Sequence, residues 1–144
     1  ADNENNRHFA LFLGNRLALA YHILEYFEIF SKKAENFGIY NWILDPGFGF
    51  SKTIQQNYNL LKGISQFKHI YMSDHMPVSI LIGVSRKSMI YKHFDISPEA
   101  SLPATQVLHL YALQNGADVL RVHDVAEAKR TIEPLMSSVE KTLI

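Results

Sequence analysis

The chain has 144 residues, of which 47% are hydrophobic and 19% are charged, an ordinary composition for one globular domain. Its formal net charge is zero, which argues against nucleic acid or a membrane surface as the main partner, because both attract a basic excess. The absence of cysteine excludes disulfides, thiolate zinc sites and a cysteine nucleophile, and it fits a reducing cytoplasm.

The first part of the chain predicts a helix, a strand and a second helix. Apolar and small residues recur in steps of three and four over 17–34, which indicates a helix packed on one face, with Gly38 as its stop. Residues 40–44 are short and apolar, and we expect a buried strand there. Thr53 and Gln56 have the spacing of a capping box, which predicts that a second helix begins at this point.

Two further strand–helix units follow a loop that we expect over 68–77. Residues 78–84 are almost wholly apolar, which is typical of a strand covered on both faces. The Ser-Pro pair at 97–98 predicts the start of the next helix. A third strand is expected over 118–122, and Pro134 should kink or end the helix after it.

The predicted order is therefore a helix followed by three strand–helix units, with strand centres near Ile43, Ile80 and Leu120. Alternation of this kind predicts an α/β fold with a parallel sheet and right-handed crossovers. Three strands cannot close a barrel. The pattern alone therefore leaves open a short doubly wound sheet or part of an eightfold barrel.

The first strand ends in a segment that begins with Asp45 and contains two glycines. A carboxylate in this position can accept two hydrogen bonds from a planar pair of donors, and Phe50 offers an apolar wall for an aromatic ligand. The alternative is an ordinary turn in which loop amides bind Asp45. A phosphate-binding P-loop is excluded because Ser51, and not glycine, precedes Lys52.

The second strand ends in two adjacent cations, Arg86 and Lys87, flanked by the hydroxyl groups of Ser85 and Ser88. This combination suits an anion or a carboxylate, and Ser88 can begin a short helix whose free N–H groups favour negative charge. The alternative is a solvated, positively charged turn without a ligand.

The third strand ends in Arg121 and His123, which alternation places on the same side. An arginine in a buried sheet needs a partner, which is either a structural carboxylate or a substrate phosphate. Asp124 follows and can cap the last helix.

The other histidines predict no metal site. His69 and His75 lie with Asp74 in the expected loop without the spacing of metal ligands, so we expect them at the surface. His109 lies within a predicted helix and should be either exposed or packed with its nitrogens satisfied.

Three segments closely resemble the last three strand motifs of dihydropteroate synthases, which are pterin-binding enzymes. They are Leu-Asp-Pro-Gly-Phe-Gly-Phe-Ser-Lys-Thr (44–53), Gly-Val-Ser-Arg-Lys-Ser-Met-Ile (83–90) and Gly-Ala-Asp-Val-Leu-Arg-Val-His-Asp-Val (116–125). The resemblance covers residues 17–133 and leaves 1–16 unassigned, while 101–105 depart from the usual start of that helix. It implies that residues 1–144 are the C-terminal part, about strands six to eight with flanking helices, of a single pterin-binding (β/α)8 TIM-barrel domain.

The resemblance also implies roles for individual residues. Asp45, Lys87 and Arg121 would be the catalytic residues and would bind the pterin, with Asp45 on its N–H edge and Lys87 on its carbonyl and N5 side. Phe50 and Lys87 would flank the p-aminobenzoate pocket, and Ser88 would meet the carboxylate of that substrate.

The implied activity is that of a transferase in folate biosynthesis. It condenses 6-hydroxymethyl-7,8-dihydropterin pyrophosphate with p-aminobenzoate, and Arg121 and His123 would bind the pyrophosphate that leaves. The resemblance implies Mg²⁺ as the cofactor, and we expect no ligand to it in this chain, because the family's magnesium-binding asparagine belongs to earlier strands. The chain alone should be weak or inactive, because Asp45, Lys87 and Arg121 would lack the facing half of the site that the family's earlier strands supply. The resemblance further implies a cytoplasmic homodimer that is a sulfonamide target.

Two alternatives remain. One is a related pterin-binding barrel such as a methyltetrahydrofolate methyltransferase, although the motifs at Arg86 and Arg121 speak against it. The other is a non-catalytic half-barrel that associates with itself through open strand edges.

Overall fold

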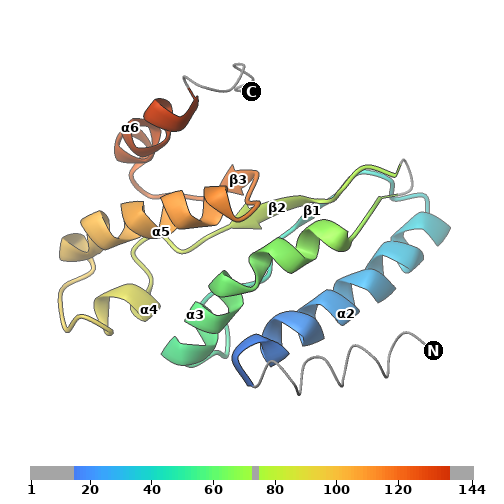
Figure 1. Ribbon diagram of the computed structural model, residues 1–144, viewed down its shortest axis with the longest axis horizontal. Coiled ribbons are helices and arrows are strands. Elements are labelled where there is room, and N and C mark those ends of the chain that lie inside the picture. The colour runs from blue at the N-terminus through green and yellow to red at the C-terminus, as the bar shows by residue number, and fades with distance from the viewer. Residues whose placement is uncertain (1–14, 73–74, 137–144) are drawn as a thin grey trace.

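The computed structural model describes residues 15–72 and 75–136, and its centre is a parallel sheet of three strands in the order β1-β2-β3 (Figure 1). The strands are β1 (Ile43–Leu44), β2 (Ser79–Ile82) and β3 (Val119–Leu120). The helices are α2 (Asn15–Asn36), α3 (Ile54–Lys62), η1 (Ile64–His69), α4 (Ser88–Tyr91), η2 (Glu99–Ser101), α5 (Leu102–Gln114) and α6 (Val125–Met136).

The three predicted strand centres are confirmed, and so is the parallel pairing. Leu44 is paired with Ile80, and Ile82 is paired with Leu120. The N–H of Arg121 donates to the carbonyl of Ile82 at 3.0 Å, so the ladder reaches the first residue after β3. All three strands consequently end at the same edge of the sheet.

The strand β2 is buried on one face only, which corrects the expectation that both faces are covered. Ile80 and Ile82 are fully buried, whereas Ser79 and Leu81 are half-buried. The helices pack against the face that carries Ile80 and Ile82. The opposite face, which carries Ser79 and Leu81, would line the interior of a closed barrel. Three strands are too few to close a barrel around it.

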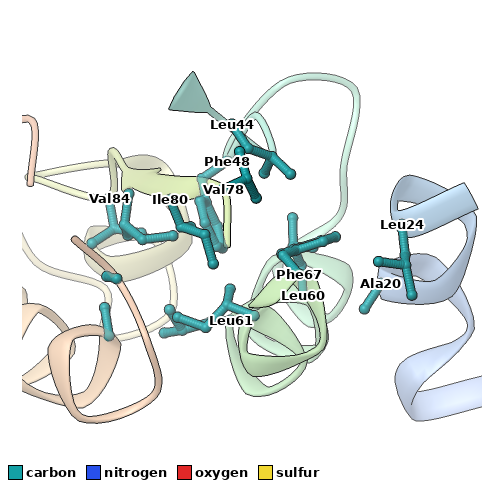
Figure 2. Packing of buried hydrophobic residues seen from close by; sticks show 14 of the residues in the cluster. Ala20, Leu24, Leu44, Phe48, Leu60, Leu61, Phe67, Val78, Ile80 and Val84 are labelled. Atoms are coloured by element: carbon teal, nitrogen blue, oxygen red, sulfur yellow. The ribbon is translucent and has the colours of Figure 1, made fainter. Parts of the chain in front are cut away.

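The hydrophobic core joins the sheet to the helices. Ala20 of α2, Leu60 of α3 and Phe67 of η1 are fully buried and belong to one cluster with Ile80 of β2 (Figure 2). The predicted apolar stripe of the first helix is confirmed by its buried members, although the side chain of Leu17 lies outside the described residues. This packing holds each strand end in place relative to the helix that follows it.

The predicted helix start at Thr53 is confirmed, whereas the start predicted at Ser97 and Pro98 is that of the 3-10 helix η2, and α5 begins only at Leu102. Thr53 and Gln56 form a complete capping box, in which the Thr53 hydroxyl accepts from the Gln56 N–H at 3.1 Å and the Gln56 side chain accepts from the Thr53 N–H at 2.8 Å. The Ser97 hydroxyl accepts from the Ala100 N–H at 3.1 Å, where η2 leads into α5.

Other expectations need adjustment. The helix α6 continues through Pro134 to Met136, so the expected end of the helix at this proline is not observed. The expected loop 68–77 contains the end of η1 and a bridge between Tyr71 and Pro77. Of the unassigned residues 1–16, those up to 14 lie outside the described residues, and 15 and 16 belong to α2.

Within residues 15–72 and 75–136, no helix is both long enough and apolar enough to cross a membrane.

The buried side chain of Asn57 holds the loop between β1 and α3. Its oxygen accepts from the N–H of Gly49 at 2.7 Å, and its amide donates to the carbonyl of Thr53 at 2.9 Å. The loop backbone therefore has fixed partners on α3, although the loop itself is exposed at Phe50.

We expect Asn57→Ala to lower the free energy of unfolding by about 1–3 kcal/mol, because it removes the hydrogen bonds by which a buried side chain holds the loop backbone. The measurement is a urea titration of the chain. Asn59→Ala is the matched control, since its side-chain oxygen accepts from exposed Gln55 on the same helix, and it should change the value by less than about 0.5 kcal/mol. Equal losses in both variants would contradict the role of Asn57.

Candidate functional site

The candidate site lies where the three strands end. Asp45 follows β1 directly and Arg121 follows β3 directly, and Nη1 of Arg121 lies 3.0 Å from Oδ2 of Asp45. Because β2 lies between these strands, the ion pair spans the whole sheet edge. The structure thus places these two candidate residues side by side, while their roles stay predictions.

The carboxylate of Asp45 also accepts from the N–H of Gly47 at 2.9 Å. Without a ligand, Arg121 is therefore paired with a structural carboxylate and Asp45 binds a loop amide, which are the structural alternatives given for these two residues. The side chains remain 55% and 33% exposed, so a ligand in solvent can reach both. Binding of a pterin edge by Asp45 stays a prediction.

Lys87 reaches from the second loop across to the first. Its Nζ donates to the carbonyl of Phe48 and lies 5.4 Å from the centroid of the Phe50 ring. Gly49 has φ of 87°, and a Cβ atom there would lie 3.4 Å from Cδ of Lys87, so the lysine stem packs against the glycine. The ring of Phe50 is 70% exposed and faces this cation, as the prediction of a shared pocket requires.

The site carries an excess of positive charge. Burial lowers the pKa of Lys87, and the nearby Arg121 lowers it further while Asp45 raises it. Burial also lowers the pKa of Lys52, whose Nζ donates to the carbonyl of Gly47 at 2.6 Å. Three cations therefore surround the single carboxylate of Asp45, an arrangement that favours an anionic ligand.

Arg86 is not part of this group, which corrects the expectation that two adjacent cations face one anion. Its Nε and Nη2 each lie 2.7 Å from an oxygen of Asp124. The backbone at Arg86 is left-handed, with φ of 52°, and its N–H donates to the hydroxyl of Thr105 at 3.2 Å. This turn directs Arg86 to the third loop while Lys87 reaches the first.

The expected cap by the side chain of Asp124 is not observed either. The carboxylate is paired with Arg86, and the backbone carbonyl of Asp124 accepts from Ala128 at 2.9 Å at the start of α6. Hydrogen bonding to Arg86 lowers the pKa of Asp124 and raises the pKa of Arg86. The pair therefore joins the second and third loops.

A second contact joins the same two loops. Ser85 is buried, and its hydroxyl accepts from the N–H of His123 at 3.2 Å and lies 3.2 Å from Nδ1 of that ring. Ser85 is therefore not available to an anion, whereas His123 is exposed at the edge of the site. Ser88 begins α4, and its hydroxyl has no hydrogen-bond partner in the described part of the chain.

The remaining histidines give one confirmation and one correction. His69 and His75 are exposed as expected, while Asp74 lies outside the described residues. His109 is buried with neither ring nitrogen hydrogen-bonded, so it is neither exposed nor satisfied, and burial lowers its pKa. Among residues 15–72 and 75–136, no group of three or more His, Cys, Asp or Glu side chains could hold a metal ion.

The Arg86–Asp124 pair predicts a pH dependence of stability. The pKa of Asp124 is depressed in the folded chain, so its contribution is present above the pKa of the unfolded carboxyl group and is lost as the pH falls through the folded value. From about pH 5 to about pH 3, the urea midpoint of Asp124→Asn should fall less than that of the wild type. The control is Glu133→Gln, at an exposed carboxyl group on α6, which should follow the wild type. Parallel curves for all three would contradict the linkage.

Comparison with known proteins identifies the site's family. A family model described as pterin binding enzyme matches residues 14–123. The dihydropteroate synthase of Escherichia coli K12 is 39% identical over 101 residues, which cover 68% of this chain and 34% of that protein. The bifunctional dihydropteroate synthase/dihydropteroate reductase of Helicobacter pylori is 40% identical over 108 residues, which cover 75% of this chain and 27% of that protein.

Solved structures agree with these relatives. The Yersinia pestis dihydropteroate synthase has a TM-score of 0.74 and 30% identity, covering 83% of this chain and 55% of that chain. The Thermus thermophilus enzyme in complex with 6HMPPP has a TM-score of 0.72 and 25% identity, covering 85% and 47%. The chain thus spans about a third or less of the curated relatives' length and about half of these solved chains. The expected part of a TIM barrel is confirmed, and the chain belongs to the pterin-binding enzyme family.

Proposed function

We propose that this chain supplies three strand ends of a dihydropteroate synthase active site. The observation that supports the proposal is the gathering of one carboxylate, three cations and an exposed aromatic ring at one sheet edge. The relatives named above are dihydropteroate synthases, which favours this activity over the methyltransferase alternative. The chain covers only part of them, so we propose that other segments complete the site.

In this proposal Asp45 accepts hydrogen bonds from the N–H edge of the pterin, and Nζ of Lys87 donates to the carbonyl and N5 side of the ring. The contacts that these groups make in the structure are with Arg121, Gly47 and Phe48, and all can be exchanged for a ligand because the groups are partly exposed. Pterin binding then replaces the existing hydrogen bonds of Asp45 and Lys87 with hydrogen bonds to the ring.

For p-aminobenzoate, the exposed ring of Phe50 provides an aromatic wall, and Lys87 lies over it. The hydroxyl of Ser88, which has no partner in the described residues, would donate to the substrate's carboxylate. These three residues come from two adjacent loops, so the pocket depends on how the loops are held together.

The proposed reaction is a displacement at the pterin methylene group. The aryl amine forms a C–N bond with this carbon, the C–O bond to the pyrophosphate breaks, and the amine loses a proton. Arg121 and His123 bind the leaving pyrophosphate, and the excess of cations stabilises the charge that develops on it. No protein nucleophile is needed, since the two substrates react directly.

Magnesium would assist this reaction by neutralising part of the pyrophosphate charge. The described residues contain no group of acidic or histidine side chains that could hold it, and Asp45 is already paired with Arg121. We therefore propose that any magnesium ligand comes from outside these residues, and no step above depends on the ion.

We further propose a cytoplasmic protein that acts as a homodimer and is sensitive to sulfonamides. Self-association is also the alternative to catalysis, and one observation favours it. Large apolar side chains face solvent on α2 and β1. Tyr26, Ile29 and Ile43 are each more than half exposed. In a complete barrel, neighbouring strands and helices cover such residues.

Lys87→Ala tests the proposed function. We expect dihydropteroate formation by the purified chain to be weak, because the facing half of the site is absent, and to rise when an N-terminal half of the barrel is supplied. In that mixture Lys87→Ala should lower the rate at least about 100-fold, since it removes a positioned cation. The measurement is product formation from both substrates.

The matched control is Lys62→Ala, at an exposed lysine of α3 away from the strand ends. It should leave the rate unchanged. Steady turnover by the chain alone would contradict the need for a facing half, and equal rates for Lys87→Ala and wild type would contradict the role of Lys87.

A further inference from the structure

Gly83 lies against the guanidinium group of Arg121. A Cβ atom on Gly83 would be 2.6 Å from Nη2 and 3.1 Å from both Cζ and Nε of Arg121. Non-bonded heavy atoms pack at about 3.5–4.0 Å, so any side chain at this position would displace the guanidinium. Gly83 does not have the left-handed backbone of Gly47 or Gly49, so the contact with Arg121, and not backbone conformation, explains the need for glycine.

The sheet order explains why this space is required. Arg121 follows β3 at one side and Asp45 follows β1 at the other, whereas Gly83 directly follows the middle strand β2. The arginine must therefore cross the end of β2 to place Nη1 at 3.0 Å from Asp45. A side chain on the middle strand at this point would stand in its path.

We propose that Gly83 is a positioning residue for Arg121, and that the arginine it admits makes the site selective for a pterin that carries a pyrophosphate. Without a ligand, the guanidinium of Arg121 is paired with the Asp45 carboxylate to which a pterin ring would bind. The contact between Gly83 and Arg121 stands on the structure, while the selectivity rests on the proposed function.

The selectivity follows from what happens to Arg121 when a ligand binds Asp45. A neutral pterin displaces the guanidinium and offers it no new partner. A pterin pyrophosphate displaces it as well but supplies an anion to which it can move. Since the Arg121 and Asp45 side chains are 55% and 33% exposed, their ion pair should weaken binding of a neutral pterin by at most about fivefold.

The contact itself is tested by a double-mutant cycle of Gly83→Ala and Arg121→Gln, measured by urea unfolding without ligand. Because only the flexible end of Arg121 has to move, Gly83→Ala should fold. We expect it to shift the urea midpoint in the wild-type background by an amount that differs from its shift in the Arg121→Gln background. Identical shifts in both backgrounds would overturn the proposed contact.

The selectivity is tested by titrating the same four proteins with 6-hydroxymethylpterin and following its fluorescence. We expect Gly83→Ala and Arg121→Gln each to bind this neutral probe up to about fivefold more tightly than the wild type, with no further gain in the double variant. Raising the ionic strength should bring the wild type toward the variants, because salt screens an exposed ion pair. Unchanged or weaker binding by both variants would overturn the selectivity.

Failure of the proposed function gives a different result. If none of the four proteins binds the probe, Asp45 does not serve a pterin in this chain, and the selectivity falls with the proposed function. The double-mutant cycle measured by urea unfolding still tests whether Gly83 positions Arg121, because that measurement needs no ligand.

Discussion

The candidate site depends on the parallel pairing of β2 with both β1 and β3. This pairing brings three strand ends, each separated from the next by more than thirty residues, to one edge of the sheet. The ion pair between Asp45 and Arg121 crosses this edge and joins its two outer strands. Side chains of opposite charge can meet there because Gly83, which directly follows the middle strand, leaves the path between them open.

The loops at this edge are held by contacts that do not themselves face a ligand. Asn57 binds the backbone of the first loop, while Arg86–Asp124 and Ser85–His123 tie the second loop to the third. Non-glycine residues with positive φ directly precede both Lys52 and Lys87, at Ser51 and Arg86. Backbone strain of this kind persists only where the surroundings enforce it, and here these contacts do so. The result is a rigid base on which Lys87 and Arg121 keep partly exposed, exchangeable partners.

Local patterns were enough to predict the elements and most of the candidate site. The apolar run around Ile80 and the capping box at Thr53 depend on neighbours in the chain, and both are present in the structure. The resemblance of the strand-end motifs to those of dihydropteroate synthases predicts Asp45, Phe50, Lys87 and Arg121 as site residues. Arg86 was misassigned because sequence spacing cannot tell which way a left-handed residue directs its side chain. Asn57 and Gly83 were missed because their partners are backbone groups and an arginine from other segments.

The sequence by itself determined the order of strands and helices, the chemical character of each strand end and the family to which the chain belongs. These properties follow from short-range periodicity and from the identity of residues within single segments. Only the tertiary structure decided which cation pairs with which carboxylate. Arg86 with Asp124 and Arg121 with Asp45 are separated by 38 and 76 residues, and either arginine carries the same charge. The choice between such partners depends on strand order and on the space left by Gly83, because ion pairing requires proximity that only packing provides.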